Sequence, residues 1–350
     1  MSQILFDQCI STMHTNLPKS PWNFFSQWWN FRYDIALYGR WQAAWTGMSG
    51  CRKKDDASGD GRLNIILLIV PVILSTLIWP INRWVMFKGS RTEAYGFWIS
   101  LSGSLTAGIL GLSLGQTFSG AALWWVGLVI AFAFAVGFCL IINYCLKIGP
   151  TGPTVAANNM GLVGPVIVGL LWPAARAFTL PIVVGLILVA LALVGFGIGS
   201  TLSSANQRTI TSRWAVLVFF GWLLAALSMT GQYVGSVLVP RQPLTLVAVF
   251  FTFSCLILLP FLIRYRRTWF NRNEFLGGII QGPCQAVSIY VSLLALQRMG
   301  AQIVFPVTVL GPVMGVLALS AFVYKERLHP ITWACCLSGV LGLALLARAK

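Results

Sequence analysis

The amino-acid sequence predicts an all-α integral membrane protein in which ten transmembrane helices form two inverted repeats of five. The first observation is composition: 57% of the 350 residues are hydrophobic and 9% are charged, whereas soluble domains carry about 25% charged residues. The second is a series of apolar runs, each near the length of about 20 residues that crosses a bilayer as a helix. The third is a shared order of features in the two halves of the chain.

The apolar runs begin at about residue 63 and continue to the C-terminus, with short loops between them. Only helices and closed barrels satisfy backbone polar groups in lipid, and runs of this length are helices. The expected spans lie near residues 63–82, 95–115, 121–146, 153–173, 178–199, 214–236, 244–264, 274–297, 302–324 and 330–347. Because the loops leave no room for a soluble catalytic domain and no span holds paired acids or a Ser/His dyad, we predict that the protein is not an enzyme.

Residues 1–62 differ from the rest of the chain, since they combine five tryptophans with polar residues and end in the charged stretch CRKKDDASGDGR. Amphipathic, aromatic-rich segments that cannot span a membrane lie in its interface. We therefore interpret residues 1–62 as an interfacial or flexible N-terminal extension; a misassigned start codon is the alternative. The remaining chain divides into a first repeat, 63–199, and a second repeat, 200–350.

The basic residues outnumber the acidic ones by 24 to 8. Lysines and arginines stand at the ends of apolar runs, where positive flanks are typical of membrane proteins, so we predict interfacial anchoring and no binding of nucleic acid. The eight cysteines form no CxxC pair and are interpreted as small core residues. We predict no metal and no cofactor. The expected partners are the lipid bilayer and an unknown small-molecule substrate, and the protein is expected to be a monomer or homodimer.

Two halves of the chain align when one is shifted along the other. A shift of about 151 residues places 124–149 over 275–300 and pairs Lys147 with Arg298, and a shift of about 147 then places Gly164-Pro165 on Gly311-Pro312. A repeat of five spans begins and ends on opposite membrane faces, so the second copy must be inverted relative to the first. Inverted repeats of this kind are the architecture of many secondary transporters.

Residues 63–350 resemble the EamA-type, ten-helix branch of the drug/metabolite transporter superfamily. The resemblance rests on LIWPINRWVMFK (77–88) and on AFVYKERLHPITWACCLSGVLGLALL (321–346), which is similar to the family's Gly-Glu turn and last helix. It implies transport of small metabolites or drugs and a helix-end role for Glu326. The corresponding turn of the first half has Ala177 in place of that acid.

Polar residues inside the spans are the candidate site, because polar groups at membrane depth are costly and face protein or a wet cavity. Gln281, Gln285 and Ser288 share one helical face. The predicted substrate-lining residues are Asn158, Asn159, Gln281, Gln285, Ser288, Tyr290, Gln302 and Thr308. The predicted gate or cavity rim comprises Trp79, Asn82, Gln232 and Tyr233. The predicted helix kinks are Gly164, Pro165, Gly311 and Pro312. Hydrogen bonding between helices and anchoring in the interface are the alternative roles.

Glycines four residues apart form a further pattern, seen at Gly111 and Gly115, Gly231 and Gly235, Gly278 and Gly282, and Gly311 and Gly315. This spacing predicts close packing between membrane helices.

The sequence favours a transporter that moves a small metabolite or drug-like solute by alternating access, as an exporter, facilitator or exchanger. No acid or histidine is expected in the middle of a span, so a carboxylate proton relay is not predicted. The alternatives are a flippase for a lipid-linked polar group and a non-conducting membrane scaffold or sensor. The expected location is the cell membrane, the inner membrane if the protein is bacterial. Ten spans place both termini on one side; loop charges favour the outside, and the resemblance implies the inside.

Overall fold

The computed structural model describes residues 57–149, 151–171, 180–203, 211–264, 271–322 and 330–348, and every regular element in these ranges is helical. The chain divides into two compact units, Met1–Asp60 and Gly61–Lys350. The second unit holds the helices considered below. The predicted extension at 1–62 lies outside the described residues except for its last part, where helix α4 begins at Ala57, before the expected start of the first span.

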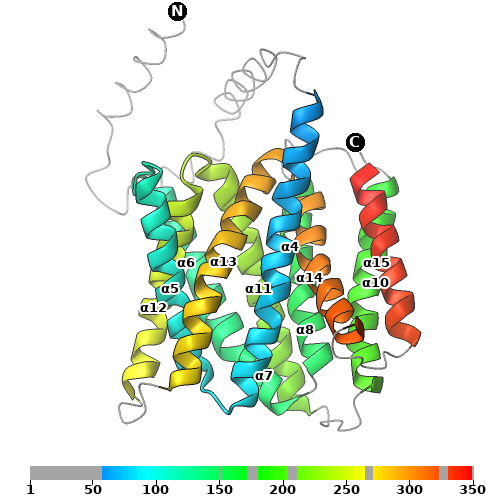
Figure 1. Ribbon diagram of the computed structural model, residues 1–350, viewed down its shortest axis with the longest axis horizontal. Helices are drawn as coiled ribbons and strands as arrows, with labels where there is room; N and C mark the ends of the chain where they lie inside the picture. The colour runs from blue at the N-terminus through cyan, green and yellow to red at the C-terminus, as the bar shows by residue number, and fades with distance from the viewer. Residues whose placement is uncertain are drawn as a thin grey trace, which may run out of the picture. The chain divides into compact units, whose positions relative to one another are not determined.

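The helices follow one another with short connections (Figure 1). In chain order they are α4 (Ala57–Phe87), α5 (Thr92–Ser113), α6 (Ala121–Phe132), the π-helix η2 (Ala133–Ile142), α7 (Asn143–Ile148), α8 (Thr151–Asn159), the 3-10 helix η3 (Met160–Leu162), α9 (Val163–Leu171), α10 (Leu180–Ser203), α11 (Ser212–Leu238), α12 (Pro243–Arg264), α13 (Arg272–Met299), α14 (Ala301–Phe322) and α15 (Pro330–Arg348).

Six of these helical segments are long and apolar enough to cross a membrane. They are Leu63–Met86, Thr92–Ser113, Ala121–Ile148, Ser212–Leu238, Pro243–Arg264 and Arg272–Met299. Shorter apolar helices occupy the other four predicted positions, at Thr154–Gly169, Leu180–Phe196, Ala301–Val316 and Pro330–Leu346. The prediction of an all-helical membrane protein is therefore confirmed for the described part of the chain.

The outward faces of the helices are strongly apolar. On α4, the large side chains of Ile65, Ile66, Ile69, Ile73 and Leu77 are each about half exposed, and steps of three or four residues from Ile65 and Ile66 through Ile69 and Ile73 to Leu77 place them along one side of the helix. Soluble monomers rarely expose apolar patches of this extent. This face is consequently expected to contact lipid.

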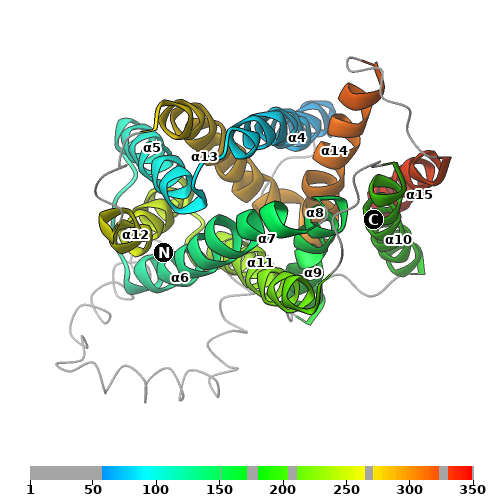
Figure 2. The ribbon, with the colours of Figure 1, turned by 90° about the horizontal axis from the view of Figure 1, so that it is seen from below.

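The helices pack side by side in pairs. Helix α5 packs against α12 and α13, α6 packs against α12, and α10 packs against α15 (Figure 2). Tight contacts depend on glycine where a side chain would collide, as at Gly185, whose added Cβ would lie 3.0 Å from the carbonyl oxygen of Gly342. Between α13 and α14 the chain reverses at Gly300, whose φ of 82° is in the region that favours glycine.

The third span contains a feature that the sequence did not reveal. Its middle turns, Ala133–Ile142, form a π-helix rather than an α-helix. Gly137 lies in this segment, and a Cβ added there would lie 2.6 Å from the Cβ of Leu224 on α11. Stretches of π-helix are rare and often mark functional sites.

Candidate functional site

A buried hydrogen-bonded cluster joins α4, α5 and α13. The Tyr95 hydroxyl donates to Oδ1 of Asn82 at 2.9 Å and also lies within hydrogen-bonding distance of Oε1 of Gln281. Tyr95 and Gln281 are fully buried and Asn82 is nearly so. A buried amide without a partner costs about 1–3 kcal/mol, so this tyrosine stabilises two predicted site residues.

The predicted polar face of α13 continues from this cluster towards the middle of α4. Nε2 of Gln281 donates to Oε1 of Gln285 at 3.4 Å. Ser288 is buried and its hydroxyl lies 3.1 Å from that of Ser75 and 3.4 Å from the carbonyl oxygen of Pro71. These bonds fasten α13 to α4, which is the hydrogen-bonding role considered as the alternative to cavity lining. Tyr290, on the same helix, is half-buried against the hydrophobic core.

A second group of predicted residues surrounds an interruption in the fourth apolar segment. Helix α8 ends at Asn159, the 3-10 turn η3 follows, and α9 begins at Val163. Pro165 has no N–H for the carbonyl of Gly161, and Gly161 lies in that turn. The interruption therefore coincides with the backbone group that the proline leaves free.

The side chains at this interruption are buried. Asn158 and Asn159 are 8% and 6% exposed, and Nδ2 of Asn159 has no hydrogen-bond partner among the described residues. Native proteins leave few such groups unsatisfied, and each one calls for an explanation. A bound solute with an acceptor oxygen would provide the missing partner.

Helix α11 approaches the interruption closely. A Cβ added to Gly164 would lie 2.8 Å from Oγ1 of Thr230 and 3.0 Å from the carbonyl oxygen of Ala226. Further along, Gly169 faces the ring of Tyr233 on α11 and the methyl group of Ala301 on α14. The neighbouring Gln302 is buried. Three helices thus bring Tyr233 and Gln302 near one end of this segment.

The corresponding stretch in the second half behaves differently. Helix α14 remains an α-helix through Pro306 and Pro312. The Thr308 hydroxyl donates to the carbonyl oxygen of Val304 at 2.8 Å, a bond within its own helix. Gly311 packs against Val72 of α4. The two Gly-Pro sites therefore occupy helices of different form, and a kink at Pro312 remains a prediction.

The remaining predicted residues have simpler surroundings. Trp79 and Gln232 are half-buried near the ends of α4 and α11, and a rim role for them remains a prediction. Glu326 and the turn that carries it lie outside the described residues.

Two contacts in the described helices were not anticipated from sequence. Tyr95 stands near the start of a span, where tyrosine is usually interpreted as an interfacial anchor, and only its fully buried position reveals it as the centre of the polar cluster. Glu274 forms an ion pair with Arg91, with 3.5 Å between Oε2 and Nη2. No sequence signal relates residues so far apart.

Tyr95→Phe is expected to lower the free energy of unfolding by about 1–2 kcal/mol, because it leaves the amides of Asn82 and Gln281 without their shared hydroxyl. Thermal unfolding of the purified protein in detergent measures this. Tyr290→Phe is the matched control, since its hydroxyl forms no hydrogen bond with the residues that the structure describes and the ring packs against apolar neighbours. Equal melting of the two variants would contradict the assigned role of Tyr95.

The fold and the buried polar residues together indicate the class of protein: a multi-pass helical membrane protein with buried polar groups between its helices. Residues 213–348 match the model of the EamA-like transporter family. For residues 213–348 the resemblance to the drug/metabolite transporter superfamily is thereby confirmed, and this match indicates a membrane transporter of small solutes.

Solved structures support the fold. Twenty-eight of their chains match this one. One of them, described only as "Crystal structure of protein", has a TM-score of 0.66 and 15% sequence identity, and the match covers 83% of this chain and 99% of that chain. At this identity the likeness concerns the fold alone. No curated protein matches the sequence.

Proposed function

We propose that the protein carries a small polar solute across the membrane by alternating access, with the solute bound beside the interrupted helix formed by α8, η3 and α9. In this proposal all ten apolar helical segments cross the membrane and form two inverted repeats of five. The observation that carries the binding site is the buried, unpartnered amide of Asn159.

The pattern of helix packing supports the inverted repeat. If the two halves are related by a two-fold axis, α4 corresponds to α11, α5 to α12, the helix α6–η2–α7 to α13, the helix α8–η3–α9 to α14, and α10 to α15. A contact between two helices then has a counterpart between the two corresponding helices. The contact of α5 with α13 has its counterpart in α6 with α12, and that of α8 with α10 in α14 with α15. The pairs α5 with α12 and α10 with α15 are their own counterparts.

Contacts of the first span complete the same pattern. The packing of η2 on α11 has its counterpart in α13 on α4, where Ser288 meets Ser75. The packing of α9 on α11 has its counterpart in α14 on α4, where Gly311 meets Val72. A pseudo-two-fold axis in the membrane plane accounts for all of these pairs, and such an axis is common in secondary transporters.

The position of the acids favours a facilitator or exchanger. In the described spans the acids Glu93 and Glu274 stand in the first turns of their helices. Proton relays in transporters rely on acids or histidines within the spans. Solute movement in this proposal therefore follows the gradient of the solute or of an exchanged solute.

Replacement of Asn159 tests the proposal. A metabolite panel is first screened for compounds that raise the melting temperature of the purified protein, since a ligand bound to the folded state stabilises it. Asn159→Ala is expected to weaken binding of the compound found by about tenfold, because one hydrogen bond to a buried amide is lost. Uptake of that compound into proteoliposomes should fall in parallel.

Asn143→Ala is the control, because Asn143 is also buried but its Nδ2 already bonds the carbonyl oxygen of Cys139 at 3.4 Å. Unchanged affinity and uptake in Asn159→Ala would reject this site. Lipid scrambling without solute uptake would favour the flippase, and neither activity would favour the scaffold or sensor.

A further inference from the structure

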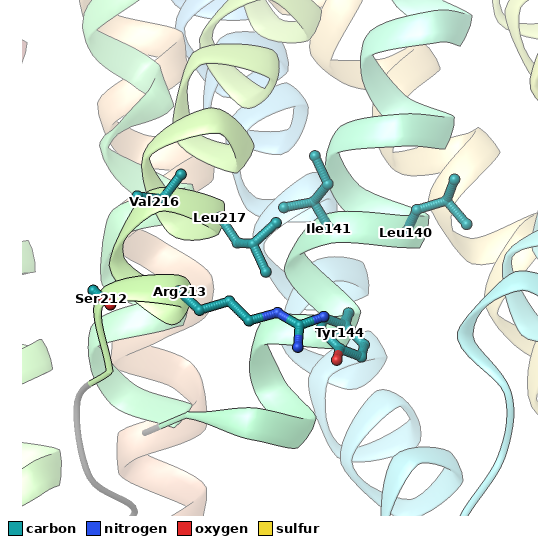
Figure 3. Close-up of a pocket in the computed structure, with 7 residues that line it drawn as sticks. All are labelled: Leu140, Ile141, Tyr144, Ser212, Arg213, Val216 and Leu217. Carbon is teal, nitrogen blue, oxygen red and sulfur yellow. The ribbon is translucent and has the colours of Figure 1, made fainter.

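A groove lies where the third span ends and the sixth begins (Figure 3). Its volume is about 510 Å³, within the range of roughly 300–1,000 Å³ typical of ligand sites. Four apolar side chains form its walls, Leu140, Ile141, Val216 and Leu217. At one end stand three polar residues, Tyr144, Ser212 and Arg213.

The groove faces outward. Val216 is 55% exposed, and Phe219, Phe220 and Leu223 follow it on the same side of α11 with comparable exposure. Their spacing of three and four residues makes one continuous apolar face. In a membrane this face contacts acyl chains, so the groove opens onto lipid and not onto the interior of the helix bundle.

Its polar end lies at the level of the membrane boundary. Tyr144 is in the last turns of the candidate span Ala121–Ile148, and Arg213 is in the first turn of the candidate span Ser212–Leu238. These two ends pack together, because the Trp214 ring packs on Cys145. The indole N–H of Trp214 also donates to Oγ1 of Thr154 on the neighbouring α8 at 3.0 Å. Aromatic and basic residues at this depth mark the headgroup region.

The charge at this end has no protein counter-ion among the described residues. The Arg213 guanidinium lies over the ring of Tyr144, 5.7 Å from its centre, a cation–π contact that holds the side chain across the mouth of the groove (Figure 3). Arg213 forms no ion pair with any residue in the described part of the chain. Its planar N–H groups suit a phosphate, which they can bind in a bidentate manner.

We infer that this groove binds one anionic phospholipid, with an acyl chain along Leu140, Ile141, Val216 and Leu217 and the phosphate on Arg213 and the hydroxyl of Ser212. A lipid has both an acyl chain for the apolar walls and a phosphate for the single arginine, whereas a free anion would use the arginine alone. The inference does not depend on which solute the protein transports, or on whether it transports one.

Native mass spectrometry of the detergent-purified protein with added phosphatidylglycerol or phosphatidylcholine tests this inference. One phosphatidylglycerol molecule is expected to bind preferentially. Arg213→Ala should lower its affinity by about fivefold, the effect of removing one basic group near an anionic lipid, and should leave phosphatidylcholine binding nearly unchanged. Val216→Trp, which fills the groove, should weaken the binding of both lipids.

Arg241→Ala is the matched control, since Arg241 is an exposed arginine at another helix start and does not line the groove. If the Arg213 and Arg241 variants lose phosphatidylglycerol affinity equally, the inference is overturned, because the loss would then follow from the lower net charge alone. Competition by inorganic phosphate at the same concentration as the lipid would also overturn it, since the acyl chain would then contribute nothing. Melting curves of the variants without lipid establish that each is folded.

Discussion

Gly282→Ala is expected to destabilise the protein by about 3 kcal/mol, the upper end of the usual cost of overpacking a core. A Cβ at position 282 would lie 1.9 Å from Oγ of Ser102, 2.5 Å from the carbonyl oxygen of Ile99 and 2.7 Å from the backbone nitrogen of Gly103. Two of these atoms belong to the backbone of α5, so no side-chain rotation relieves the collision. The helices α5 and α13 would have to move apart.

That separation would also break the hydrogen bond from the Ser102 hydroxyl to the carbonyl oxygen of Gly278, which measures 2.8 Å. Unfolding of the purified variant in detergent, followed by intrinsic fluorescence, measures the loss. Gly108→Ala is the control, because Gly108 lies on α5 with nothing within 4 Å of an added Cβ, and alanine is the better helix former. A Gly282→Ala protein that melts like the Gly108→Ala protein would show that α5 and α13 do not pack as described.

The glycine spacings show how far sequence reasoning reaches. At Gly231 and Gly235, Gly278 and Gly282, and Gly311 and Gly315, both glycines face a neighbouring helix at distances that exclude a side chain, as the four-residue spacing predicts. At Gly111 and Gly115 the prediction is wrong for the second residue. Gly115 follows the end of α5 and has a φ of 68°, and a Cβ added there would meet nothing within 4 Å, so it ends a helix.

The candidate site likewise contains some residues that the sequence predicts and some that it does not. The repeating polar residues of α13 identify a face from sequence because a helix has a fixed period, and Gln281 and Ser288 are indeed buried between helices. Their partners Tyr95 and Ser75 stand on other helices far away in the chain, and no local pattern relates such residues. The π-helix of the third span packs against α11, and no pattern in its own segment predicts it, whereas the 3-10 turn of the fourth span lies beside Gly164 and Pro165, which the sequence marks as a kink.

The second large effect is expected at Glu274, which connects the first turns of α5 and α13. Its Oε1 accepts the backbone N–H of Arg91 at 2.7 Å, and Oε2 lies 3.5 Å from the Arg91 guanidinium. Arg91 is the N-cap residue of α5, whose own side chain provides no capping bond. The carboxylate of Glu274 therefore serves as the cap, and the dipoles of both helices favour its negative charge at this point.

Removal of one partner from a buried ion pair costs about 3–5 kcal/mol, but the Arg91 side chain is 25% exposed and Glu274 only 1%, so water reduces the loss. We expect Glu274→Gln to lower the free energy of unfolding by about 2 kcal/mol, since the amide oxygen still accepts the Arg91 N–H while the charge attraction is lost. Glu274→Ala should cost roughly 1 kcal/mol more, because the N–H then has no acceptor.

Glu93→Gln separates this specific pairing from a general effect of charge. Glu93 stands in the first turn of α5, as Glu274 does in α13, but it is half-buried and no ion pair of its carboxylate is seen in the described part of the chain. It should lose only the dipole contribution, about 0.3–1 kcal/mol. A double-mutant cycle with Arg91→Met isolates the ion pair. If the effects of Glu274→Gln and Arg91→Met simply add, the two charges contribute independently and the carboxylate acts on the backbone of α5 alone.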